Sequence, residues 1–98
     1  MFGKRTELKI PDAAKADPEA VEILRIWLSG GSQHVSLKTG VWDDPAAWGL
    51  MLADLAGHVA NAYAADGADR EETLRRVAHG FQIEMDSSTD EPRGAVED

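Results

Sequence analysis

The stretch AVEILRIWLSGGSQHVSLKTGVW, residues 20–42, decides the fold because it is compatible with two structures. In the first, residues 18–29 form a helix that ends at Gly30. In the second, Gly30 and Gly31 form the two-residue loop of a β-hairpin, since glycine adopts the positive φ angles of such a turn at no steric cost. The distribution of side chains along the two arms distinguishes these structures.

Pairing outward from a turn at residues 30–31 sorts the side chains by polarity. One face of the hairpin collects mostly apolar residues, namely Leu24, Ile26, Leu28, Gln33, Val35 and Leu37. The other face collects mixed and polar residues, namely Ile23, Arg25, Trp27, His34, Ser36 and Lys38. A slip of one residue would move a whole arm to the wrong face. We therefore favour the hairpin, with strands at about 21–29 and 33–39, over the helix.

Two amphipathic helices are predicted after the hairpin. Asp44 can cap the first, over about 45–65, and Gly67 is a natural stop after it. Asp69 can cap the second, over about 70–85. The short link between the helices predicts an antiparallel pair.

These elements indicate an α+β fold, in which a small antiparallel sheet is covered on one face by the helix pair. Residues 6–10 could add a short strand. We assign residues 1–86 to a single domain and residues 87–98, which are polar and acidic, to a disordered tail. A hairpin sheet leaves an edge open and is marginal alone, so we expect a homodimer.

The charge, the cysteine content and the apolar runs of the sequence limit the kinds of partner, site and location that we expect. The net charge is −8, which disfavours nucleic acids and anionic membranes as general partners. The chain has no cysteine, which excludes disulfides, zinc sites built on thiolates and cysteine nucleophiles. No apolar run predicts a signal peptide or a membrane span, so we expect a cytoplasmic protein.

Asp54 and His58 lie four residues apart on the flank of the first long helix, where an acid and an imidazole form a favourable pair. An ion pair is the simplest interpretation. A metal or acid–base site would need a third group, for which His34 is the natural candidate. His34 lies on the sheet face away from the predicted helices, so such a site would have to form across a dimer.

On the polar face of the hairpin, Arg25, Trp27 and His34 form a candidate surface for a ligand or partner. The alternative is that the N-terminal segment folds over Trp27. No glycine-rich phosphate loop, HExxH or GxSxG motif occurs.

Three segments, EILRIWLSGGSQHVSL (22–37), WGLMLADLAGHVANAY (48–63) and FQIEMDSSTD (81–90), resemble a family of short uncharacterised bacterial proteins, mainly alphaproteobacterial, known as a domain of unknown function. The resemblance covers roughly residues 6–90. It implies a free-standing small cytosolic protein and no particular activity.

The function expected from the sequence is therefore that of a small cytosolic binding or interaction module that acts as a homodimer, with a protein as a candidate partner. Its binding surface would be formed by Arg25, Trp27 and His34, and Asp54 and His58 would form a second candidate surface. The alternative is a small metal-dependent or acid–base enzyme that uses His34, Asp54 and His58. A third class is a structural or antitoxin-like partner. We expect no cofactor and no resident metal.

Overall fold

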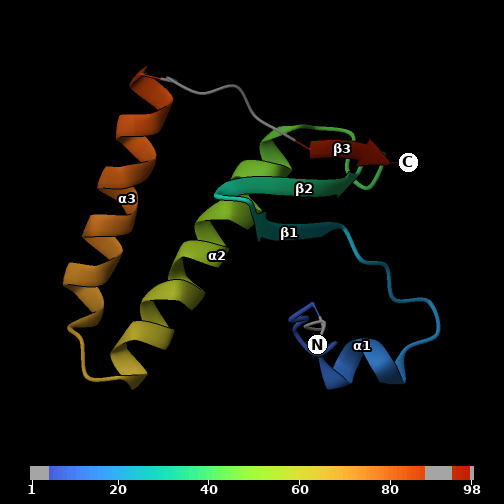
Figure 1. Cartoon of the computed structure of the whole chain (residues 1–98), viewed down its shortest axis with the longest axis horizontal. Helices are drawn as coiled ribbons and strands as arrows, with labels where there is room; N and C mark the ends of the chain where they lie inside the picture. Colours follow the sequence, from blue (N-terminus) through green and yellow to red (C-terminus); the bar gives the residue numbers. More distant parts are fainter. Residues whose placement is uncertain (1–4, 88–93, 98) are drawn as a thin grey trace.

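A computed structural model describes residues 5–87 and 94–97 of the chain. Figure 1 shows the order of its elements along the chain. They are α1 (Asp12–Ala16), β1 (Leu24–Ser29), β2 (Ser32–Lys38), α2 (Ala46–Ala65), α3 (Arg70–Ser87) and β3 (Gly94–Glu97). The predicted α+β class, with a hairpin and two packed helices, is confirmed.

The hairpin has the register that the polarity pattern predicts. Leu24 pairs with Leu37 at one end of the antiparallel ladder, and Ser29 pairs with Ser32 at the turn. Gly30 and Gly31 have φ angles of 60° and 76°. These left-handed conformations fit a turn whose twist matches that of the two strands. The alternative helix over residues 18–29 is therefore wrong.

A third strand extends the sheet where the sequence predicted a tail. β3 pairs in parallel with β2, so that the strand order is β1-β2-β3. Residues 88–93 and 98 of the predicted tail lie outside the described residues, and its disorder stays a prediction for them. Residues 6–10 do not form a strand. The side chain of Glu7, rather than a backbone ladder, joins this segment to the sheet.

Both long helices begin as their capping residues predict. A carboxylate oxygen of Asp44 accepts a hydrogen bond from the backbone N–H of Ala46 at 2.9 Å. A carboxylate oxygen of Asp69 accepts one from the backbone N–H of Glu71, also at 2.9 Å. Such bonds satisfy N–H groups that have no partner within the helix. A short loop then joins α2 to α3, and the two helices run in opposite directions (Figure 1).

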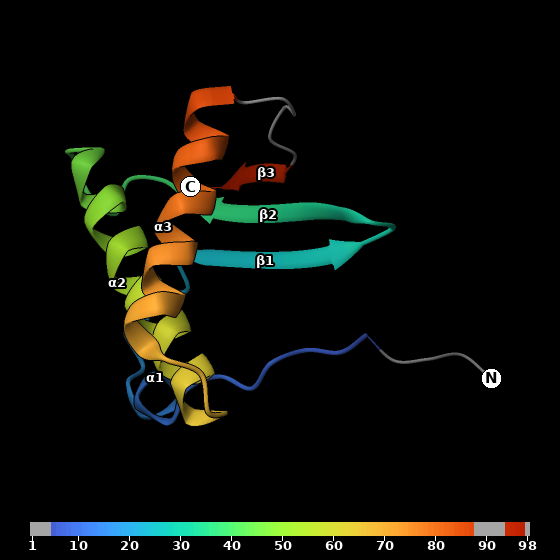
Figure 2. The same ribbon diagram turned by 90° about the vertical axis from the view of Figure 1, so that its left-hand side faces the viewer.

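Of the two long helices, α2 lies nearer the sheet, and it covers only part of the apolar sheet face (Figure 1). α2 passes behind the hairpin in Figure 1, and Figure 2 shows that the turn of the hairpin points away from both helices. Leu24, at the end near the helices, is half-buried, whereas Leu28 near the turn is 83% exposed. Among the described residues, Ala60 alone is fully buried. The described part of the chain therefore has almost no closed core.

Candidate functional site

An open hollow lies over the polar face of the hairpin, and it contains the three residues that the sequence predicted as a binding surface. Its volume is about 740 Å³. The sheet lines it with Arg25, Trp27, Leu28, Ser29, His34 and Ser36, and the N-terminal segment with Arg5, Thr6 and Glu7. Side chains alternate along a strand, so Arg25, Trp27, His34 and Ser36 share one face because of the register.

Arg25 is the most highly connected side chain of this hollow. Its guanidinium donates hydrogen bonds to Glu7 at 3.0 Å and to Glu22 at 3.2 Å. The hydrogen bond and charge of Glu22, with those of Glu7, raise the pKa of Arg25. The guanidinium carbon also lies 5.8 Å from the centre of the Trp27 ring, which allows a cation–π contact.

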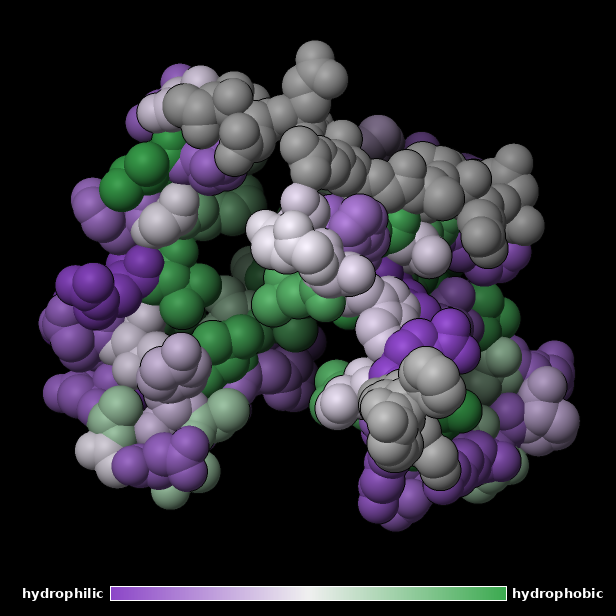
Figure 3. All heavy atoms as spheres, in the orientation of Figure 1, coloured by the Kyte–Doolittle hydropathy of each residue, from purple (hydrophilic) through white to green (hydrophobic). Residues whose placement is uncertain are grey.

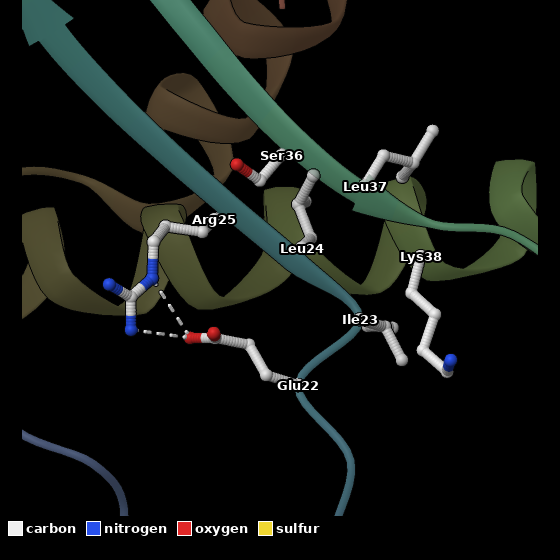
Figure 4. Close-up of a pocket in the computed structure, with 7 residues that line it drawn as sticks. All are labelled: Glu22, Ile23, Leu24, Arg25, Ser36, Leu37 and Lys38. Atoms are coloured by element: carbon white, nitrogen blue, oxygen red, sulfur yellow. Dashed lines mark hydrogen bonds and ion pairs between the residues drawn. The ribbon is translucent and has the colours of Figure 1, made fainter. Parts of the chain in front are cut away.

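A smaller hollow of about 150 Å³ lies next to the first, at the open end of the hairpin. Figure 4 shows Arg25 turned towards Glu22, with Ser36 beside it on β2. Leu24, Leu37 and Lys38 line the other side of this hollow. Arg25 and Ser36 line both hollows.

His34 and Trp27 face each other across the two strands of the hairpin. The Nε2 atom of His34 lies 3.3 Å from the backbone oxygen of Ser29, within hydrogen-bond distance. Trp27 is half-buried, whereas His34 is exposed. The surface thus combines an aromatic ring, an imidazole and a guanidinium, three groups that bind planar or acidic partners well.

The N-terminal segment contributes residues that the sequence analysis did not assign to the site. Arg5, Thr6 and Glu7 reach the hollow although they precede β1 by many residues. The alternative interpretation of Trp27, coverage by this segment, is therefore partly correct. The segment lines the hollow without closing it. The one sequence signal for the contact between this segment and the sheet is that Glu7 carries a charge opposite to that of Arg25.

Asp54 and His58 form the expected pair on α2, away from this hollow. The His58 Nε2 and Asp54 Oδ2 atoms are 3.5 Å apart, and the side chains are 71% and 81% exposed. Neither residue lines either hollow described above. Within residues 5–87 and 94–97, no three histidine, aspartate or glutamate side chains are grouped to hold a metal ion. Within one chain, His34 therefore does not join Asp54 and His58 in such a group.

Comparison with known proteins assigns the family. A family model described as "Domain of unknown function (DUF5076)" matches residues 7–89. The chain belongs to this family. No curated protein matches this DUF5076 chain.

A solved structure shares the fold of the DUF5076 chain. It is described as a "putative pyruvate dehydrogenase" from the photosynthetic bacterium Rhodopseudomonas palustrus CGA009. The two chains are 29% identical, and the match covers 94% of each with a TM-score of 0.71. Among the helices of the described part, none combines the length and apolar character needed to cross a membrane.

Proposed function

We propose that this DUF5076 chain is a small cytosolic binding module that acts as a homodimer and binds its partner through the hollow over β1 and β2. The observation that carries this proposal is the convergence of Arg25, Trp27 and His34 in one open hollow. Tryptophan and arginine are the side chains most enriched where binding energy concentrates in protein interfaces. A protein is accordingly the partner class that we favour.

The contact between Glu7 and Arg25 indicates what the hollow can accept. Glu7 presents a carboxylate on an irregular, non-helical segment, and Arg25 binds it beside the ring of Trp27. A partner segment with an acidic side chain could make the same contact by exchanging with Glu7. Arginine suits this role because its planar group donates to carboxylates with defined geometry.

The other parts of the proposal have separate support. The near absence of buried residues favours a homodimer. The exposed pair of Asp54 and His58 is a second, weaker candidate surface. The bacterial source of the solved relative supports the bacterial, mainly alphaproteobacterial, origin that we infer for the chain. The activity in that relative's name belongs to that protein and carries no part of this proposal.

The small metal-dependent or acid–base enzyme remains the alternative function. This enzyme would need His34 of one copy to lie beside Asp54 and His58 of a second copy. The described part of one chain contains no group of three such side chains that could hold a metal ion. No contact or hollow in the structure favours it over the binding module. A zinc titration of the histidine resonances separates the two.

The test is a partner capture followed by a measured affinity. Tagged wild-type protein and its Trp27→Ala and Arg25→Gln variants are expressed in the cells of origin, and the proteins bound to each are identified. The control is His79→Ala, which changes an exposed residue on α3 far along the chain from the hollow. We expect to capture a partner that binds both the wild-type protein and His79→Ala. When this partner is purified, its affinity for Trp27→Ala should be at least tenfold lower than its affinity for the wild-type protein. Equal affinity for all four proteins would exclude the hollow as the binding surface.

A further inference from the structure

Burial decreases along α3 in a way that its own sequence does not explain. Leu74, Val77, Phe81 and Met85 lie within about 80° of one another around the helix and form one apolar stripe. Leu74 and Val77, near the loop to α2, are half-buried. Phe81 and Met85, farther along, are 53% and 65% exposed. The second half of the stripe is therefore as apolar as the first but uncovered.

Burial decreases in the same way along the side of α2 that faces α3. Gly49, Ala53, Ala60 and Ala64 share one side of this helix, and their small size allows a second helix to approach closely. Ala60 is fully buried and Ala64 is half-buried, near the loop. Gly49 and Ala53, near the start of the helix, are exposed. Leu52, at the edge of this side, is 43% exposed.

The two gradients arise because the helices diverge. Figure 1 shows α2 and α3 close together at their loop and well separated at their other ends. Figure 3 shows hydrophobic side chains gathered on the inner sides of this pair, along the opening between the helices. We call this surface, formed by Leu52, Ala53, Phe81 and Met85, the helix wedge. It is an apolar surface that the described part of the chain does not cover.

The chain exposes enough surface beyond that of a compact monomer to supply a stable dimer interface. The chain exposes 8626 Å², whereas a compact monomer of its mass exposes about 5,500 Å². Its radius of gyration is 15.8 Å, against about 13 Å for a compact domain of this length. The excess area over the whole chain is about 3,000 Å², which is more than the roughly 1,000–2,500 Å² that permanent homodimers bury on each copy.

The residues outside the described part offer few apolar side chains for this cover. The residues outside the described part include only two large apolar side chains, Met1 and Phe2. A second copy, in contrast, brings an identical wedge. Two such surfaces are complementary to each other under a two-fold axis, which is the commonest symmetry of soluble oligomers.

We propose that two copies of the chain pair through their helix wedges, so that α2 and α3 of each copy complete one shared helical core. This inference rests on the homodimer in the proposed function and names its interface. It leaves the hollow at Arg25 and Trp27 outside the interface, free for a partner. The dimer is thus the folded unit that presents the binding surface.

Two substitutions on α3 test this interface directly. Phe81→Asp places a charge in the wedge. Ile83→Asp is the matched control, because Ile83 is 52% exposed but lies on the roughly opposite side of the helix from the stripe. Light scattering during size-exclusion chromatography should give wild type and Ile83→Asp twice the chain mass of 10.6 kDa. The Phe81→Asp variant should have a dimer dissociation constant raised at least 100-fold.

A measurement on the unmodified protein covers the case in which Phe81→Asp does not fold. In a mixture of isotope-labelled and unlabelled wild-type chains, filtered NMR spectra should show contacts between copies from the Phe81 ring and the Met85 methyl group. A monomeric wild type would overturn both this interface and the homodimer. A dimer that shows no such contacts, or that dissociates with Ile83→Asp but not with Phe81→Asp, would overturn the interface alone. Neither result affects the test of the Arg25 hollow.

Discussion

The guanidinium of Arg25 lies 3.0 Å from the carboxylate of Glu7, eighteen residues earlier in the chain. This ion pair joins the N-terminal segment to the sheet beside Trp27. Arg25 has a second carboxylate partner in Glu22, so it keeps an ion pair when Glu7 moves away. The segment that bears Glu7 can therefore be exchanged without leaving Arg25 unpaired.

The first prediction concerns this exchange. We expect Glu7→Gln to weaken the hold of residues 5–10 on the sheet, because a neutral amide binds a guanidinium less strongly than a carboxylate does. The indole N–H resonance of Trp27 should shift, and NMR relaxation should show more motion in residues 5–10. The resonances of Trp42 and Trp48 should stay in place. Glu19→Gln is the control, and an equal effect of both variants would contradict the role of Glu7.

The second prediction concerns Asp54 and His58. Because both side chains are largely exposed, we expect Asp54→Asn to lower the free energy of unfolding by less than about 0.5 kcal/mol. Urea unfolding of the two proteins measures this difference. A loss of several kcal/mol would mean that the pair is buried in the assembled protein and that its role is more than a surface contact.

The third prediction separates the binding module from the metal-dependent alternative. Addition of one zinc ion per chain should leave the ring resonances of His34 and His58 unchanged, because the described residues contain no three-residue metal group. The NMR spectrum of the wild-type protein reports both rings at once. A joint shift of the two histidines, lost in Asp54→Asn, would instead establish a shared site between copies.

The fourth prediction uses two glycines in opposite environments. Gly31 has a φ of 76°, so Gly31→Ala should destabilise the hairpin by about 1–2 kcal/mol. Gly80 lies inside α3, and an added Cβ there would meet no atom within 4 Å. Gly80→Ala should therefore stabilise the protein by about 0.5–1 kcal/mol. Thermal unfolding gives both values, and a stabilising Gly31→Ala would contradict the turn geometry, whereas a destabilising Gly80→Ala would contradict the open space beside Gly80.

The fifth prediction concerns the start of α3. Asp69→Ala removes the acceptor for the N–H groups of Glu71 and Glu72, which should cost about 1 kcal/mol. Asp69→Asn should stay close to wild type, because asparagine caps helices about as well as aspartate. Chemical unfolding of the three proteins tests this order. Equal losses for both variants would indicate that the charge, rather than the hydrogen bonds, holds the helix end.

Local patterns predicted most of the fold. The register from Leu24 opposite Leu37 to Ser29 opposite Ser32 follows from a turn at residues 30–31 together with the polarity pattern, because a slip of one residue would mix the two faces. The starts of α2 and α3 follow from Asp44 and Asp69, whose effect extends over one helical turn. These features depend on residues close together in sequence.

The features that the sequence did not predict depend on distant partners or very short segments. β3 is four residues long and lies in a polar stretch, and its parallel pairing with β2 joins segments far apart in the chain. α1 has five residues, too few for a recognisable apolar period. The alternation of strand residues likewise predicted that Arg25, Trp27 and His34 lie together. The position of Glu7 beside them depends on the path of the N-terminal segment, which no local pattern predicts.

That Ala60 is the one fully buried residue of the described part has a consequence for how the cell can control this protein. In the proposed dimer, a chain with so little closed interior would gain most of its folding free energy from association, so its stability would rise and fall with its own concentration. At low copy number, separated chains would unfold and become substrates for proteases. The amount synthesised would then set a threshold, below which the protein is cleared and above which it persists.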